Sequence, residues 1–167
     1  PGYGEGGDTQ LPAPGWSGGS HGGLGGKSTT ESGTLADSYG NLYYPETSGG
    51  GAGTSGAGWG GGIVILEVAN TLTINGVVSA DGGGSSKGGG AGGSVRVTAG
   101  IIGGLGSISA DGGDASTKKY DCGYNCSEHV GGGGGGRIAL LGYDQLVGAF
   151  DPSGLPTSVH AYGGSTK

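Results

Sequence analysis

Residues 76–83 read GVVSADGG, and the same pattern returns at residues 106–113 as GSISADGG. A weaker third copy, SVHAYGG at residues 158–164, keeps the β-branched residue, the alanine and the glycine pair. Self-similarity of this kind is the signature of a repeat architecture, in which each repeat buries its apolar side chains against its neighbours. The repeated stretch therefore predicts a stack of three similar layers.

A second recurring element precedes each copy and consists of glycine followed by alternating apolar residues. It occurs at residues 61–65 as GGIVI, at residues 93–97 as GSVRV and at residues 136–140 as GRIAL. The interval between the second and third occurrences is longer than the first interval. One loop, residues 111–136, is therefore enlarged relative to an otherwise regular repeat.

Each repeat contains several short strand patterns. Residues 63–68 are apolar at nearly every position, which is typical of a strand that is covered on both faces. Residues 72–74 and 77–80 follow as shorter strands, separated by the tight turn that Asn75-Gly76 favours. Short strands separated by corners are the layout of one coil of a parallel β-helix. We therefore predict an all-β fold, a short right-handed parallel β-helix-like solenoid of about three coils.

Stacked coils align equivalent residues of successive repeats. One interior ladder is expected to contain Val78, Ile108 and Val159. A second ladder, at a position where only a small side chain fits, is expected to contain Ala80, Ala110 and Ala161. Because a coil buries its apolar face only against its neighbours, three coils are close to the minimum for a stable fold.

Glycine dominates the composition, with 49 of the 167 residues. Residues 1–60 have almost no apolar alternation but many Gly-Gly pairs, which permit extended threefold helices that pack closely because no Cβ intervenes. We expect residues 1–60 to form a glycine-rich, polyglycine-II-like layer beside a three-coil β-solenoid at residues 61–167, in which residues 111–136 form the enlarged loop. Together they are expected to form one compact domain.

The net charge of the chain argues against two classes of binding partner, nucleic acids and anionic membranes. Seven basic and thirteen acidic residues give a net charge of −6, whereas nucleic acids and anionic membranes attract clustered cationic side chains. No apolar run approaches the 18 or so residues of a membrane span. The sequence therefore predicts no nucleic-acid partner and no membrane span.

Two cysteines, Cys122 and Cys126, lie four positions apart in the enlarged loop. We predict that they form a disulfide, which fits an oxidising compartment; two free thiols are the alternative. Asn125 begins an Asn-Cys-Ser sequence that meets the rule for N-glycosylation. Both features favour a secreted or cell-surface location.

Asp81 and Asp111 occupy the same position in the first two repeats and are expected to stack at a corner beside glycine turns rich in carbonyl groups. Such a corner is a candidate calcium site, because calcium prefers oxygen ligands. The alternative is that each aspartate caps backbone amides of its own turn. The sequence predicts no other metal and no cofactor.

Several stretches together resemble a known type of sequence. These are GGSHGGLGG at 18–26, GGGIVI at 60–65, the two copies of SADGG, and GGRIAL at 135–140. They resemble the glycine-rich β-solenoid-like repeat region of large secreted or cell-surface proteins of plants, protists and bacteria, over about residues 18–164. The resemblance implies an extracellular module used in adhesion or matrix, and it assigns a function to no individual residue.

The sequence predicts an extracellular structural protein and not an enzyme. The expected last coil is open, and an uncovered coil favours addition of another copy, so head-to-tail assembly into a filament or matrix follows. An alternative hypothesis is a carbohydrate- or receptor-binding adhesin that displays the loop at 111–136. A third hypothesis is a polysaccharide-cleaving enzyme that uses the charged side chains of this region, Asp111, Asp114, Lys118, Lys119, Asp121 and Arg137.

Overall fold

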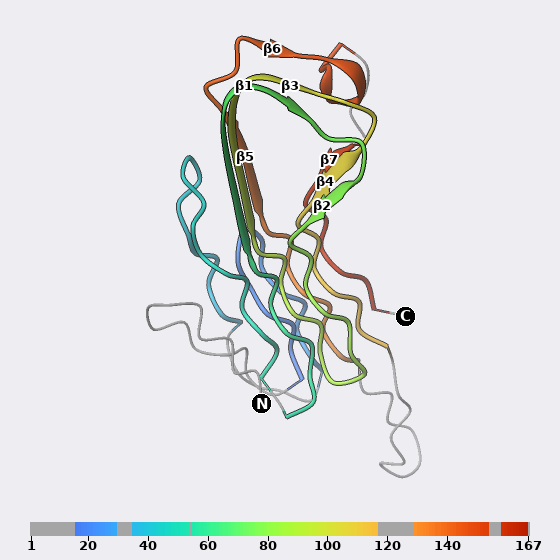
Figure 1. Ribbon diagram of the computed structural model, residues 1–167. Coiled ribbons are helices and arrows are strands. Elements are labelled where there is room, and N and C mark those ends of the chain that lie inside the picture. The colour runs from blue at the N-terminus through green and yellow to red at the C-terminus, as the bar shows by residue number, and fades with distance from the viewer. Residues whose placement is uncertain (1–15, 30–34, 54, 117–128, 154–157, 167) are drawn as a thin grey trace, which may run out of the picture.

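The computed structural model describes residues 16–29, 35–53, 55–116, 129–153 and 158–166. Two parallel β-sheets occupy one end of the molecule, and glycine-rich extended segments run side by side at the other end (Figure 1). Among the described residues, the longest helical segment is a single 3-10 turn, η1 (Gly148–Phe150). No helix of the described residues is long and apolar enough to cross a membrane.

The first sheet has the order β1-β3-β5, with all strands parallel. It is formed by β1 (Ile63–Thr73), β3 (Ser94–Gly103) and β5 (Arg137–Leu141), while β6 (Gln145–Leu146) continues the third row by pairing with the second half of β3. The register places Val64 opposite Val95 and Val95 opposite Ile138. The recurring GGIVI, GSVRV and GRIAL stretches therefore pair with one another.

The second sheet is smaller and has the order β2-β4-β7, again parallel. Its strands are β2 (Val77–Ser79), β4 (Ser107–Ser109) and β7 (Val159–His160). The register pairs Val78 with Ile108 and Ile108 with Val159. The predicted ladder of these three residues is confirmed.

The predicted right-handed β-helix-like solenoid is wrong. The described residues form two small parallel sheets, of four and three strands, and neither of them closes or curls. The physical reason lies in the glycine runs that complete each layer. A solenoid encloses an interior filled by side chains, but glycine has none, so these segments bring their backbones into direct contact instead of lining an interior.

Hydrogen bonds in the glycine-rich part recur at every third residue. In the run at residues 131–136, the amides of Gly131 and Gly134 donate to the carbonyls of Trp16 and Gly19, at 3.0 and 2.8 Å. A threefold extended helix presents every third residue to the same neighbour, which accounts for this period. The same period relates further pairs of donor and acceptor: Gly58 and Gly88, Gly61 and Ala91, Gly133 and Gly113, and Gly136 and Ala110.

Close packing of these segments requires the absence of side chains. A Cβ on Gly131 would lie 1.8 Å from the carbonyl oxygen of Gly26, and one on Gly133 would lie 2.0 Å from that of Gly90. Residues 131–135 are buried. The glycine run at residues 131–136 thus lies inside the layer, where residues 16–26 pack against it, while residues 49–61 pack against residues 83–93.

Candidate functional site

Polar side chains of the second sheet form two rows across its three layers. Ser79, Ser109 and His160 are paired in register. Two residues further along the chain, just beyond the end of each strand, lie Asp81, Asp111 and Tyr162, and the hydroxyl of Ser79 donates to Oδ2 of Asp81. This corner contains Asp81 and Asp111, the two candidate calcium ligands predicted from the sequence.

Asp81 is bound on both carboxylate oxygens by donors from two layers. Its Oδ1 accepts the Asp111 N–H at 2.7 Å, and its Oδ2 accepts the hydroxyls of Ser79 at 2.7 Å and Ser109 at 3.0 Å. Partial burial opposes ionisation, but the Asp111 N–H and the two hydroxyls outweigh it and lower the pKa of Asp81 below its usual value. The carboxylate is therefore held ionised as a hydrogen-bond acceptor.

Asp111 repeats this contact one layer further on. Its Oδ1 accepts the Tyr162 N–H at 2.8 Å and lies 2.9 Å from Nδ1 of His160. The imidazole of His160 stacks on the Tyr162 ring, with ring centroids 5.1 Å apart. Each aspartate thus binds the backbone of the following layer, and the row ends at Tyr162, which has no carboxylate.

These contacts favour a structural role for the two aspartates. Donors of the protein already occupy both oxygens of Asp81, which leaves fewer lone pairs for a cation. Within the described ranges, no group of three or more His, Cys, Asp or Glu side chains could hold a metal ion. Calcium binding at Asp81 and Asp111 stays a prediction, and the part of the chain that the structure describes adds no third acidic ligand to it.

The residues considered for sugar cleavage do not form one cluster in the described part of the chain. Asp114 Oδ1 accepts the backbone N–H of Ser165 at 2.8 Å, near the end of the second sheet. Arg137 begins β5 in the other sheet, where its Nε donates to the carbonyl of Tyr39 at 2.9 Å. Other predicted site residues lie outside the described residues: Lys118, Lys119, Asp121, Cys122, Asn125 and Cys126.

His21 is a buried residue whose importance the sequence did not indicate. Its side chain is fully buried, with Nδ1 2.8 Å from the carbonyl oxygen of Gly92 and Nε2 2.9 Å from Oγ1 of Thr47. A carbonyl only accepts, so Nδ1 carries the proton and Nε2 accepts the Thr47 hydroxyl. Burial lowers the pKa of His21, the Gly92 contact partly opposes this, and Arg137 lowers it further.

Tyr39 packs beside this histidine, with ring centroids 4.9 Å apart. Burial raises the pKa of Tyr39 to about 12, and its hydroxyl donates to the carbonyl of Ser48 at 2.7 Å. His21 and Tyr39 therefore join three parts of the chain in a neutral, hydrogen-bonded contact. The sequence signal was a lone imidazole inside a glycine run, which is too common a pattern to identify such a contact.

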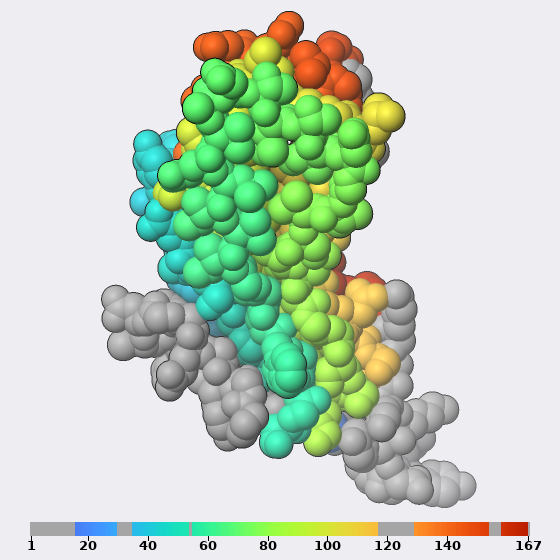
Figure 2. Space-filling view, in the orientation of Figure 1, coloured from blue at the N-terminus to red at the C-terminus, as the bar shows by residue number. Residues whose placement is uncertain are grey.

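The apolar core is most deeply buried in its middle layer and only partly covered at both ends, although Ile74 of the first layer and Phe150 of the third are buried as well. Val95, Val97, Ile102 and Ile108 of the middle layer are 0% exposed. The equivalent apolar residues of the outer layers are only partly buried: Val64, Leu66, Val68, Leu72 and Val78 at one end, and Ile138, Leu140, Leu146 and Val159 at the other. Figure 2 shows the first of these ends, where β1 and β2 lie at the surface. Both faces of the three-layer stack thus leave apolar surface in contact with water.

The comparisons with known proteins assign no family to this chain. No protein-family model matches it, and no curated protein or solved structure does so. The resemblance to glycine-rich repeat regions of cell-surface proteins therefore stays a prediction.

Proposed function

We propose that this chain is an extracellular structural module that assembles head to tail with copies of itself into a filament or matrix. The observation that carries the proposal is the difference between the core residues of the middle layer, which are 0% exposed, and their counterparts in the outer layers, which are only partly buried. A layer added at either end would bury the outer apolar residues as Val95 and Ile108 are already buried. Another copy of the same chain supplies such a layer.

Open strand edges provide the backbone contacts for this addition. β1 pairs only with β3, so one edge of this 11-residue strand has no partner among the described residues. At the other end of the sheet, β3 is likewise the one strand of the described ranges that pairs with β5. Unpaired strand edges template the addition of further strands. A contact between β5 of one copy and β1 of the next joins two different surfaces, and repetition of such a contact generates an open fibre.

The free energy gained by burying apolar side chains between two copies is comparable with the free-energy cost of association. Nine partly buried apolar residues meet when two ends join. Full burial of one such side chain stabilises by roughly 2 kcal/mol. If association supplies about half of this for each residue, the gain is on the order of 10 kcal/mol. Association costs roughly 4–15 kcal/mol in lost motional freedom. We therefore expect polymers whose length depends on protein concentration.

A charge placed on the open edge tests this proposal. Thr71 is exposed near the C-terminal end of β1, and lysine on an edge strand opposes strand addition. We expect Thr71→Lys to shift the onset of polymerisation to higher protein concentration in sedimentation-velocity experiments. Leu105→Lys is the matched control, because Leu105 is 85% exposed in the middle layer between β3 and β4.

Two results would overturn the proposal. The first is a wild-type protein that sediments as a monomer at every concentration tested. The second is equal assembly of the wild type and Thr71→Lys while Leu105→Lys also assembles normally, since the open edge of β1 then has no part in the contact. Circular dichroism spectra matching that of the wild type confirm that each variant is folded.

A further inference from the structure

Residues 39–48 lie against the outer face of the first sheet and are fastened to it near both ends. At one end, the Arg137 side chain binds the carbonyl of Tyr39. At the other end, the Ser94 hydroxyl donates to the carbonyl of Thr47 at 2.6 Å. The apolar side chains of the tip between these attachments are exposed: Leu42 by 64%, Tyr43 by 71% and Tyr44 by 58%.

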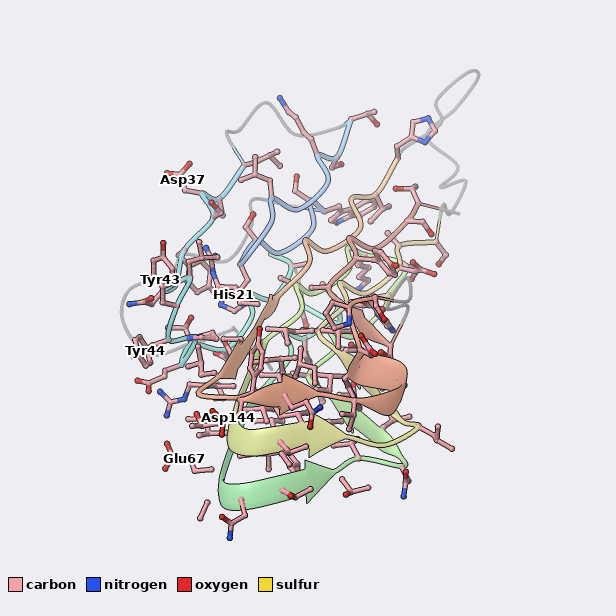
Figure 3. All side chains as sticks on the ribbon, turned by 90° about the horizontal axis from the view of Figure 1, so that it is seen from above. His21, Asp37, Tyr43, Tyr44, Glu67 and Asp144 are labelled. Carbon is pink, nitrogen blue, oxygen red and sulfur yellow. The ribbon has the colours of Figure 1, made fainter. Side chains whose placement is uncertain are left out.

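The backbone of this tip is held in one conformation. Oδ1 of Asn41 accepts the N–H groups of Tyr43 at 2.8 Å and Tyr44 at 3.0 Å. Gly40 precedes the turn with a positive φ of 89°, which glycine adopts without strain. Figure 3 shows Tyr43 and Tyr44 on the flank of the molecule, with their side chains directed away from its body. Two aromatic rings are therefore presented to solvent on a preorganised turn.

A charged cluster adjoins these rings. The guanidinium carbon of Arg96 lies 5.9 Å from the centroid of the Tyr44 ring. Arg96 forms ion pairs with Glu46 and with Glu67, the latter at 3.3 Å. The two carboxylates are largely exposed, whereas the Arg96 side chain is 13% exposed. Its Nε is buried and has no hydrogen-bond partner among the described residues.

We propose that Tyr43, Tyr44, Glu46, Glu67 and Arg96 form a binding surface for a neutral polysaccharide. Tyrosine combines an apolar ring face with a polar hydroxyl, which suits the C–H face and the hydroxyl groups of a sugar ring. The exposed carboxylates accept hydrogen bonds from sugar hydroxyls. The two carboxylates outnumber the single guanidinium with which they pair. The cluster therefore carries no excess positive charge that would attract a phosphate or sulfate group.

Other occupants fit this surface less well. A stable protein interface occupies about 20–30 residues on each side, whereas the exposed tip is a single turn. A nucleic acid is disfavoured by the net charge of −6 and by the acidic excess of the cluster. The tip lies on the flank of the layer stack and not over its ends (Figure 3), so another copy of the chain that adds to an end does not cover it. The proposal thus goes beyond end-to-end assembly.

Isothermal titration calorimetry of the full chain tests the proposal. The neutral probes are cellohexaose, chitohexaose, xylohexaose and mannohexaose, and a heparin hexasaccharide is the anionic probe. We expect saturable binding of at least one neutral probe with a Kd below about 1 mM. Tyr44→Ala is expected to weaken this binding by roughly tenfold through the loss of ring stacking. Tyr143→Ala, which removes an exposed tyrosine after β5, is the matched control and leaves the Kd unchanged.

Three outcomes would overturn the proposal. One is the absence of binding of every neutral probe at millimolar concentration. Another is unchanged affinity in a folded Tyr43→Ala/Tyr44→Ala variant, which would place the sugar elsewhere. The third is binding of the heparin probe alone, which would show selection for negative charge. Sedimentation of Tyr44→Ala separates the two proposals, because end-to-end assembly does not require this side chain.

Discussion

Replacing Gly133 by alanine is expected to destabilise the fold far more than the same replacement at Gly62. A Cβ on Gly133 would lie 2.0 Å from the carbonyl oxygen of Gly90, 2.4 Å from its carbonyl carbon and 2.9 Å from the nitrogen of Ala91. All three are backbone atoms, so no side chain can rotate away to make room. By contrast, a Cβ on Gly62 would meet no atom within 4 Å.

The expected loss of unfolding free energy in Gly133→Ala follows from the backbone contacts that must shift. Overpacking costs about 1–3 kcal/mol where neighbours can adjust. Here, adjustment also weakens the bonds from Gly133 N to Gly113 O (2.9 Å) and from Gly164 N to Gly133 O (2.7 Å). Each contributes about 1 kcal/mol, so we expect a loss of about 3–5 kcal/mol. Gly62→Ala is expected to change the free energy of unfolding by less than about 1 kcal/mol, because it mainly restricts the unfolded chain.

Urea denaturation followed by circular dichroism measures both effects. Gly83→Ala is an intermediate case, since its Cβ would lie 3.3 Å from the Trp59 nitrogen. We expect the free energy of unfolding to fall in the order Gly62→Ala, Gly83→Ala, Gly133→Ala. A Gly133→Ala protein within about 1 kcal/mol of Gly62→Ala would refute direct backbone packing in the glycine layer. A Gly133→Ala chain that does not fold supports it, provided that Gly62→Ala folds normally.

Three further predictions concern the contacts between segments. Because the folded-state pKa of His21 is lowered, its contribution to stability is complete above the unfolded pKa of about 6.5 and is lost as the pH falls through the folded value. His21→Gln should therefore show a weaker dependence of the urea midpoint on pH between 7 and 4 than the wild type; an identical dependence would contradict this. Asp111→Ala removes the two bonds that this carboxylate accepts from the Tyr162 N–H and His160 Nδ1, each worth about 0.5–1.5 kcal/mol because water can reach the donors, and should lower the unfolding free energy by about 1–3 kcal/mol in urea titrations; a change within about 0.5 kcal/mol would exclude a stabilising bond between layers. Ile102→Ala, at a fully buried position, should cost about 2–5 kcal/mol in the same assay, against less than about 0.5 kcal/mol for exposed Leu105→Ala; equal costs would contradict the assigned core.

The register of the layers could be predicted from the sequence because equivalent positions of successive repeats pair with one another. Equivalent β-branched residues recur in each copy, and the pairing of Val78, Ile108 and Val159 follows once the copies are stacked. The overall architecture could not be obtained in the same way. Side-chain periodicity is informative only where side chains exist, and the path of a glycine run is decided by which other backbones it meets. The prediction of a β-helix extended the strand pattern into such runs.

The candidate sites likewise contain one part that could be predicted from the sequence and one part that could not. The sequence indicated that Asp81 and Asp111 share a corner, because both occupy one repeat position. It did not indicate that each carboxylate binds the N–H of the next layer, since this contact depends on the register between layers. The contact of His21 with Gly92 and Thr47 joins residues far apart in the chain, and no local pattern marks it. Long-range contacts of single polar residues were thus the least predictable part of the structure.

Cryo-electron microscopy of unconcentrated protein tests end-to-end assembly most directly. Neighbouring parallel strands lie about 4.8 Å apart, so addition of a three-layer copy in continuous register predicts a fibre with an axial rise of roughly 14 Å per subunit. A fibre with this rise, in which β1 of one copy follows β5 of the preceding copy, is the result that we expect. Dispersed single particles, or fibres whose rise is unrelated to three strand spacings, would contradict the proposed assembly.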